Sequence, residues 1–87
     1  MKYYMVTIRD NVAATYRVPA CVPNIGGFLR SLGDEVNRAA QDNEFYKHPE
    51  DFEVFQLGSY DDETADFEIL ARPTSLALLK SMVREAH

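Results

Sequence analysis

The stretch FYKHPEDFEVFQLGSYDDETADFEIL, residues 45–70, decides the fold of this 87-residue chain. Two segments rich in aromatic and aliphatic residues, FEVFQLGSY and DFEILA, flank the polar sequence DDET. Strand-forming runs separated by turn-forming residues predict a β-hairpin, and we expect Phe67 and Ile69 to face inward. Ahead of the hairpin, KHPED predicts a single helical turn with Pro49 at its first position. The sequence therefore predicts an antiparallel sheet as the central element of the fold.

The segments before the hairpin extend this sheet and add a helix. Residues 3–8, YYMVTI, favour a strand because aromatic and β-branched residues fit a pleated surface. Residues 16–23 contain two prolines and predict an edge strand or extended coil. From Asn24, a plausible N-cap, to about Ala40, apolar residues recur every three or four positions and predict a helix. Its apolar stripe consists of Ile25, Phe28, Leu29, Leu32 and Val36.

The C-terminal segment predicts a second helix. RPTS is expected to end the preceding strand, with Thr74 or Ser75 as N-cap. In residues 76–86, LALLKSMVREA, a stripe of Leu76, Leu79 and Val83 has helical spacing. The predicted order is β-(β)-α-β-β-α. The fold class is α+β, a small antiparallel sheet of three to four strands with two helices packed on one face, and residues 1–87 form a single domain.

Composition and charge narrow the function classes. No apolar run approaches the length of a membrane span, and the N-terminus lacks the features of a signal peptide. Cys21 is the only cysteine, so no internal disulfide can form; we expect it to be buried or half-buried. Residues 41–70 contain ten acids and one base and carry −9, whereas the rest, with eight bases and four acids, carries +4. Such asymmetry can steer charged partners.

The acidic hairpin does not match a known catalytic or metal-binding pattern. Asp61, Asp62, Glu63 and Asp66 lack the alternating oxygen ligands, the central glycine and the late glutamate of a calcium loop. No apolar pocket is indicated that would separate the pKa values of paired carboxylates. His48 is expected to cap the Pro49 turn or to pair with a neighbouring acid. We therefore predict no catalytic residues, no metal, no cofactor and no enzymatic activity.

The basic residues near the N-terminus suggest a different site. Lys2, Arg9, Tyr16 and Arg17 combine cations with aromatic rings, as single-strand binders do when they stack bases and contact phosphates. The simpler alternative is that the arginines solubilise the chain and the tyrosines belong to the core. Because stacking platforms usually accompany a positive groove, the acidic composition by itself favours this alternative.

The hairpin sequence also resembles a known family. The combination of HPED, residues 48–51, with LGSYDDET, residues 57–64, is similar to the small nonstructural protein of gokushoviruses, single-stranded DNA phages of the microvirus group. The resemblance covers nearly the whole chain. It departs from the family at Ala65, where glycine is frequent. In this family, His48, Pro49, Glu50, Asp51 and Gly58 are expected to have structural roles.

The resemblance implies a non-capsid phage protein that acts in the host bacterial cytoplasm, in viral DNA synthesis or single-strand DNA packaging. One hypothesis is that the protein binds phage single-stranded DNA through Lys2, Arg9, Tyr16 and Arg17. The alternative is an adaptor without DNA affinity, whose Asp61, Asp62 and Glu63 dock a viral or host replication protein or a capsid protein. A third possibility is self-association into a homo-oligomer, in which the acidic segment of one copy contacts the basic remainder of another. No membrane partner is expected.

Overall fold

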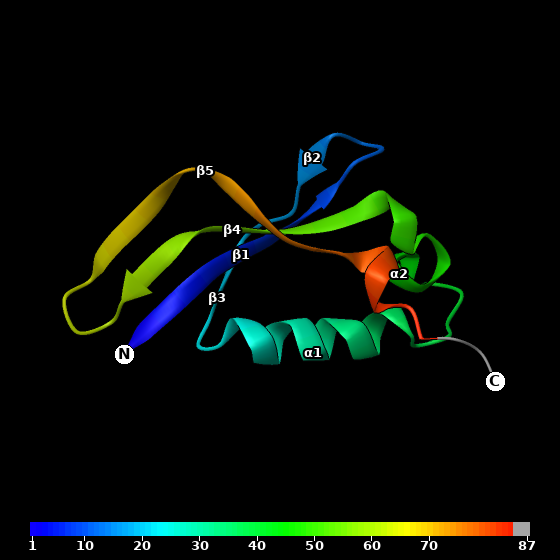
Figure 1. Cartoon of the computed structure of the whole chain (residues 1–87), viewed down its shortest axis with the longest axis horizontal. Helices are drawn as coiled ribbons and strands as arrows, with labels where there is room; N and C mark the ends of the chain where they lie inside the picture. Colours follow the sequence, from blue (N-terminus) through cyan, green and yellow to red (C-terminus); the bar gives the residue numbers. More distant parts are fainter. Residues whose placement is uncertain (85–87) are drawn as a thin grey trace.

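The computed structural model describes residues 1–84 and contains a twisted antiparallel sheet with a helix along one face (Figure 1). The strands are β1 (Lys2–Asp10), β2 (Thr15–Tyr16), β3 (Ala20–Val22), β4 (Phe52–Asp61) and β5 (Asp66–Leu78). The helices are α1 (Ile25–Val36) and α2 (Glu44–Lys47), and two 3-10 turns are η1 (Pro49–Asp51) and η2 (Leu79–Met82). The predicted α+β class is confirmed.

The sheet has the order β2-β1-β4-β5, and β3 also pairs with β1. β2 and β3 lie one after the other along the same edge of β1: Arg9 is opposite Tyr16, and Met5 is opposite Cys21. Pro19 lies between the two short strands, where its missing N–H interrupts no pairing. The sheet is therefore four strands wide. Cys21, expected to be at least half-buried, is exposed because it lies on an edge strand.

The predicted apolar stripe of α1 forms the main core. Leu32 and Val36 pack against Phe52 and Val54 of β4 and against Leu79 of η2. The helix begins as predicted, since the Asn24 side chain accepts a hydrogen bond of 2.8 Å from the Gly27 N–H. It ends at Val36 and not at Ala40, because Asn37 closes it: the Asn37 amide donates to the Gly33 carbonyl at 2.7 Å. The second helix of the fold, α2, was not predicted.

The predicted C-terminal helix is wrong. Strand β5 continues through RPTS to Leu78, and only the 3-10 turn η2 follows; residues 85–86 of the predicted helix lie outside the described part. β4 offers an unpaired edge, and Ala77 and Leu78 pair with it, opposite Val54 and Glu53. Pairing with β4 thus overrides the helical periodicity, while Leu79 still enters the core. Pro73 is tolerated because it lies where β5 and β4 lose register.

The prediction that Phe67 and Ile69 face inward is also wrong. Phe67 is 58% exposed and Ile69 is 65% exposed. Both residues alternate correctly along β5, but Ile69 shares a face with Met5, which is opposite to the face of Ile8 and α1, and nothing within residues 1–84 covers it. The hairpin formed by β4 and β5 projects beyond the start of α1 (Figure 1), so no helix of the described residues lies beneath or above this part of the sheet.

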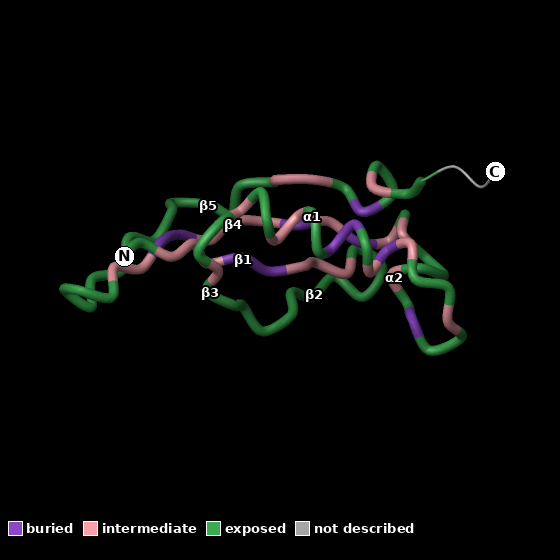
Figure 2. The backbone as a smooth tube through the Cα atoms, turned by 90° about the horizontal axis from the view of Figure 1, so that it is seen from below, coloured by how far each residue is buried: buried purple, intermediate pink, exposed green. Residues whose placement is uncertain are grey.

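The molecule is 47 Å long and 26 Å wide, and burial is uneven along its length (Figure 2). We call residues 6–10, 52–56 and 74–78 with α1 the covered half. We call residues 2–5 and 58–69 the hairpin half. A bulge at Leu57 separates them: Met5 is opposite Gly58, whereas Val6 is opposite Gln56. The fully buried side chains Leu79, Val6, Val36 and Val54 all belong to the covered half or to segments packed on it.

Candidate nucleic-acid interface

Three of the four predicted DNA-binding residues lie together at the β2 edge of the sheet; we call Arg9, Tyr16 and Arg17 the basic patch. Arg9 and Tyr16 are direct partners across β1 and β2. The Arg9 guanidinium lies 5.5 Å from the centre of the Tyr16 ring, and this ring is 45% exposed. On its other side, Tyr16 makes an edge-to-face contact with Phe55 at 5.6 Å. The tyrosine is thus supported, accessible and adjacent to a cation.

Arg17 reaches the opposite face of the same edge. Its guanidinium lies 4.5 Å from the centre of the Phe45 ring and 5.7 Å from that of Phe52. Its backbone is fixed to β1, since its N–H donates to the Ile8 carbonyl and its carbonyl accepts from the Thr7 hydroxyl at 2.6 Å. Arg9 and Arg17 therefore flank the edge from both sides and do not form a flat platform.

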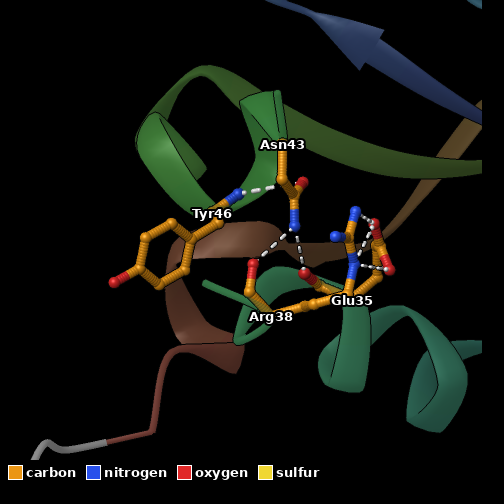
Figure 3. Close-up of polar contacts among 4 residues, drawn as sticks. All are labelled: Glu35, Arg38, Asn43 and Tyr46. Atoms are coloured by element: carbon orange, nitrogen blue, oxygen red, sulfur yellow. Dashed lines mark hydrogen bonds and ion pairs between the residues drawn. The ribbon is translucent and has the colours of Figure 1, made fainter. Parts of the chain in front are cut away.

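The position of Phe45 depends on Asn43, which the sequence analysis missed. Asn43 is 4% exposed and joins the end of α1 to the start of α2 (Figure 3). Its amide donates to the Glu35 carbonyl at 2.8 Å and to the Arg38 carbonyl at 2.9 Å, and its oxygen accepts from the Tyr46 N–H at 3.3 Å. These bonds satisfy backbone groups that helix ends leave open. Asparagine before Glu44 is an N-cap signal that sequence inspection could have found.

Lys2, the fourth predicted residue, is not part of the basic patch. It lies at the opposite end of β1, seven residues or about 23 Å from Arg9 along the strand. Its direct partner on β4 is Asp61. It lines a shallow hollow together with five hairpin residues: Ser59, Asp61, Thr64, Asp66 and Glu68. Lys2 thus faces the acidic side of the hairpin half.

Acidic residues also surround the basic patch. Glu53 lies opposite Arg9 across β1 and β4, although its carboxylate accepts a hydrogen bond from the Ser75 hydroxyl. Glu35 and Glu44 line a hollow with Arg17. Among residues 1–84, neither Arg9 nor Arg17 makes an ion pair within 4 Å. Both cations can contact a phosphate, and the neighbouring acids will limit the affinity.

The acidic turn of the hairpin contacts the N-terminus. The Met1 amino group lies 2.5 Å from Asp62 and 3.9 Å from both Asp61 and Glu63. The hydrogen bond donated to Asp62 raises the pKa of this amino group above its ordinary value. Glu63 remains the most exposed of the three acids, with 81% of its side chain accessible. The amino group of Met1 thus partly neutralises the negative charge of the turn, while Glu63 remains accessible to a partner.

Ala65 closes the hairpin turn in a left-handed conformation, with φ of 60°. This explains why glycine suits the position, since only glycine adopts such a φ without a steric penalty. Ala14 has φ of 56° in the β1–β2 turn. Both turns also begin alike: Asp10 accepts hydrogen bonds from two backbone N–H groups of its turn, and Asp61 accepts one from Glu63.

The family-marking residues occupy structural positions. Pro49 begins η1 as predicted, and the Asp51 N–H donates to the His48 carbonyl at 3.1 Å. The His48 ring lies 3.6 Å from the Glu50 carboxylate. Gly58 lies where β4 passes close to β5: a Cβ there would be 2.1 Å from the Glu68 carbonyl oxygen. Gly58 is therefore required by the close approach of two backbones and not by an unusual φ.

One surface cluster of the described residues has the residue types of a metal site. His48, Glu50 and Asp51 offer ligand atoms within 4.8 Å of one another. Such surface groups often occur without an ion, and we assign none to them. Within residues 1–84, no helix combines the length and apolar character that a bilayer span requires.

Comparison with known proteins identifies the family of the chain. Neither the curated proteins nor the solved structures provide a match. A family model described as "Phage ORF5 protein" matches residues 3–82, which includes the hairpin, the basic patch and the HPED turn. The chain therefore belongs to the phage ORF5 protein family.

Proposed function

We propose that this phage protein is a non-catalytic accessory of viral DNA synthesis or single-strand DNA packaging, acting in the host bacterial cytoplasm. In this proposal it binds phage single-stranded DNA, as the resemblance to the gokushovirus nonstructural proteins suggests. The observation that carries the proposal is the basic patch, in which an exposed Tyr16 ring lies beside the Arg9 guanidinium at 5.5 Å. An exposed aromatic ring can stack on any base, and an adjacent arginine can contact the phosphate.

The surroundings of the basic patch favour single-stranded over double-stranded DNA. The patch lies on a narrow sheet edge, with Arg9 on one side and Arg17 on the other. A single strand can pass over such an edge and present an unstacked base to Tyr16, whereas a duplex keeps its bases stacked. The neighbouring acids favour weak, reversible binding, which suits a protein that must leave the genome again.

Fluorescence anisotropy of labelled single- and double-stranded oligonucleotides, at low and physiological salt, tests the proposal. We expect a preference for the single strand and binding that weakens with salt, with a logarithmic slope of about 0.7 per phosphate contact. Tyr16→Ala should weaken binding clearly. Tyr46→Ala is a matched control, because Tyr46 is 44% exposed but lies away from the basic patch on α2.

The arginines provide the second comparison. Arg9→Gln and Arg17→Gln should each lower the affinity and reduce the salt slope, whereas Arg30→Gln, the same change on the exposed side of α1, should not. Absence of binding at low salt, or equal losses in the control variants, would rule out this interface.

The adaptor function is the second candidate, and the position of the acidic turn favours it. Asp61, Asp62 and Glu63 lie at the projecting end of the molecule (Figure 1), where a basic partner could reach them. The partner would be a viral or host replication protein or a capsid protein. Co-purification of such a partner that is lost when the three residues become Asn, Asn and Gln would support this function. Retention of the partner would contradict it.

A further inference from the structure

The hairpin half has one apolar face on which Phe67 and Ile69 are largely exposed and the other side chains are half-buried. Direct cross-strand partners share a face, and two rows of partners define this one. Tyr3 is opposite Tyr60, which is opposite Phe67, and the rings of Tyr60 and Phe67 lie 4.7 Å apart. The next row joins Met5, Gly58 and Ile69. The apolar hairpin face thus consists of Tyr3, Met5, Tyr60, Phe67 and Ile69.

The other face of the same hairpin is acidic. Its two rows are Lys2, Asp61 and Asp66, and Tyr4, Ser59 and Glu68. Single exposed apolar residues such as Val18 are ordinary on protein surfaces, but a contiguous apolar face opposite a charged one marks an interaction surface. The acids exclude nucleic acid and anionic membranes as occupants, because both would be repelled by the hairpin.

The charge distribution along β5 fits a second copy of the chain. Residues 70–73 form an arch: Ile69 pairs with Gly58 and Thr74 with Gln56, so that four residues of β5 face one of β4. Arg72 lies in this arch, exposed, and it makes no ion pair within 4 Å among the described residues. Each hairpin therefore has an acidic turn at its tip and a free cation at its base.

We propose that two copies form a two-fold dimer by stacking their apolar hairpin faces, the tip of each hairpin lying over the base of the other. A two-fold contact brings the same surface of both copies together, so apolar side chains meet at its centre. At both ends the turn of Asp61, Asp62 and Glu63 meets the partner's base at Arg72. A parallel arrangement would instead place the two acidic turns together.

This dimer is compatible with the rest of the molecule. The basic patch lies at the opposite end of β1 from the hairpin and stays accessible in both copies. Cys21 lies opposite Met5 on β3, beside the apolar hairpin face, and is exposed in the single chain. The apolar hairpin face has five side chains, fewer than the roughly 20–30 residues that each partner contributes to a standard interface, so we expect a weak dimer.

Sedimentation equilibrium of the full chain, up to about 1 mM, tests the proposal. We expect a monomer–dimer equilibrium and slower reaction of Cys21 with a maleimide as the dimer forms. Phe67→Ser and Ile69→Ser should each raise the dissociation constant at least about tenfold, as loss of a central apolar contact does. Both side chains are exposed in the monomer, so the variants should fold, which circular dichroism can verify.

Matched controls separate this interface from others. Val12→Ser and Val18→Ser remove exposed apolar residues outside the hairpin and should leave the dissociation constant unchanged. Arg72→Glu should weaken the dimer several-fold, whereas Arg30→Glu, the same charge change on α1, should weaken it less. A monomer at all concentrations, a dimer insensitive to Phe67→Ser and Ile69→Ser, or equal effects of the two arginine variants would overturn the proposal. Arg9→Gln, which tests DNA binding, should dimerise normally, so the two proposals can fail independently.

Discussion

The covered half and the hairpin half share the same two central strands, yet only one of them contains a core. β1 and β4 alternate side chains in both halves. α1 packs on the face of the sheet that contains Ile8 and Val54, and its 12 residues extend about 18 Å at 1.5 Å per residue, in a molecule 47 Å long. The apolar side chains Met5, Phe67 and Ile69 of the hairpin half lie on the opposite face of the sheet, which α1 does not cover. Strand alternation assigns a face, but only a covering element decides whether that face is an interior.

Truncating Leu79, which packs on the covered half, and truncating Ile69 in the hairpin half should show the largest difference. Leu79 is fully buried against α1, and Leu79→Ala should lower the free energy of unfolding by about 3 kcal/mol, since it leaves a cavity in the core. Ile69→Ala should change it by less than about 0.5 kcal/mol, because Ile69 is mostly exposed in the monomer. Urea denaturation at low protein concentration measures both. Similar losses would mean that the hairpin half is also a packed interior.

Adding a methyl group to a glycine should have opposite effects in the two halves. Gly58→Ala places a Cβ against the Glu68 carbonyl and should destabilise the protein by about 3 kcal/mol, because backbone must move. In Gly33→Ala the nearest atom is 3.8 Å away, on the Arg84 side chain, and alanine favours the helix. This variant should gain up to about 1 kcal/mol. Thermal unfolding of both variants checks the signs, and a stable Gly58→Ala would contradict the close approach of β4 and β5.

Removing the Asn43 side chain should weaken the end of the covered half. Asn43→Ala deletes three hydrogen bonds at a buried position and should cost about 2 kcal/mol, measured by urea denaturation. Asn43→Asp keeps the oxygen that caps α2 but loses the two donated hydrogen bonds. If the cap contributes to stability, this variant should be more stable than Asn43→Ala and less stable than the wild type. Because Phe45 depends on α2, DNA affinity should fall together with stability. Unchanged stability would show that Asn43 does not join the two helices.

Relieving the left-handed alanines should give the smallest effect, in the stabilising direction. Ala65→Gly in the hairpin half and Ala14→Gly in the β1–β2 turn should each raise the free energy of unfolding by about 1 kcal/mol, because glycine adopts positive φ without strain. Ala13→Gly is the control, since Ala13 has no positive φ and gains nothing from glycine. Differential scanning calorimetry can resolve these shifts. Destabilisation by Ala65→Gly would show that unfolded-chain entropy outweighs the strain.

The candidate site was predictable residue by residue but not as a group. As cations and an aromatic residue, Lys2, Arg9, Tyr16 and Arg17 are the residue types that suggest nucleic-acid binding. Their spacing along the chain does not show which of them lie together in space. The register of β1 with β2 brings Arg9 to Tyr16, whereas the register of β1 with β4 brings Lys2 to Asp61. The register of β1 with β2 depends on the short turn that joins them, whereas the register of β1 with β4 depends on pairing between segments far apart in the chain, which local sequence does not encode.

The sequence by itself determined the local features of this protein. The spacing of apolar residues from Ile25 to Val36, the Asn24 cap, the Pro49 turn and the DDET turn each depend on neighbours within a few residues, and all are present in the structure. Tertiary structure decided the rest. Residues 76–78 have helical spacing but form a strand because the edge of β4 supplies hydrogen-bond partners. Phe67 and Ile69 alternate as core residues but remain exposed because they lie on the face of the sheet opposite to α1. In both cases the outcome depends on which distant segment is available to pair or to pack, and intrinsic preferences of a few tenths of a kcal/mol per residue are too small to oppose it.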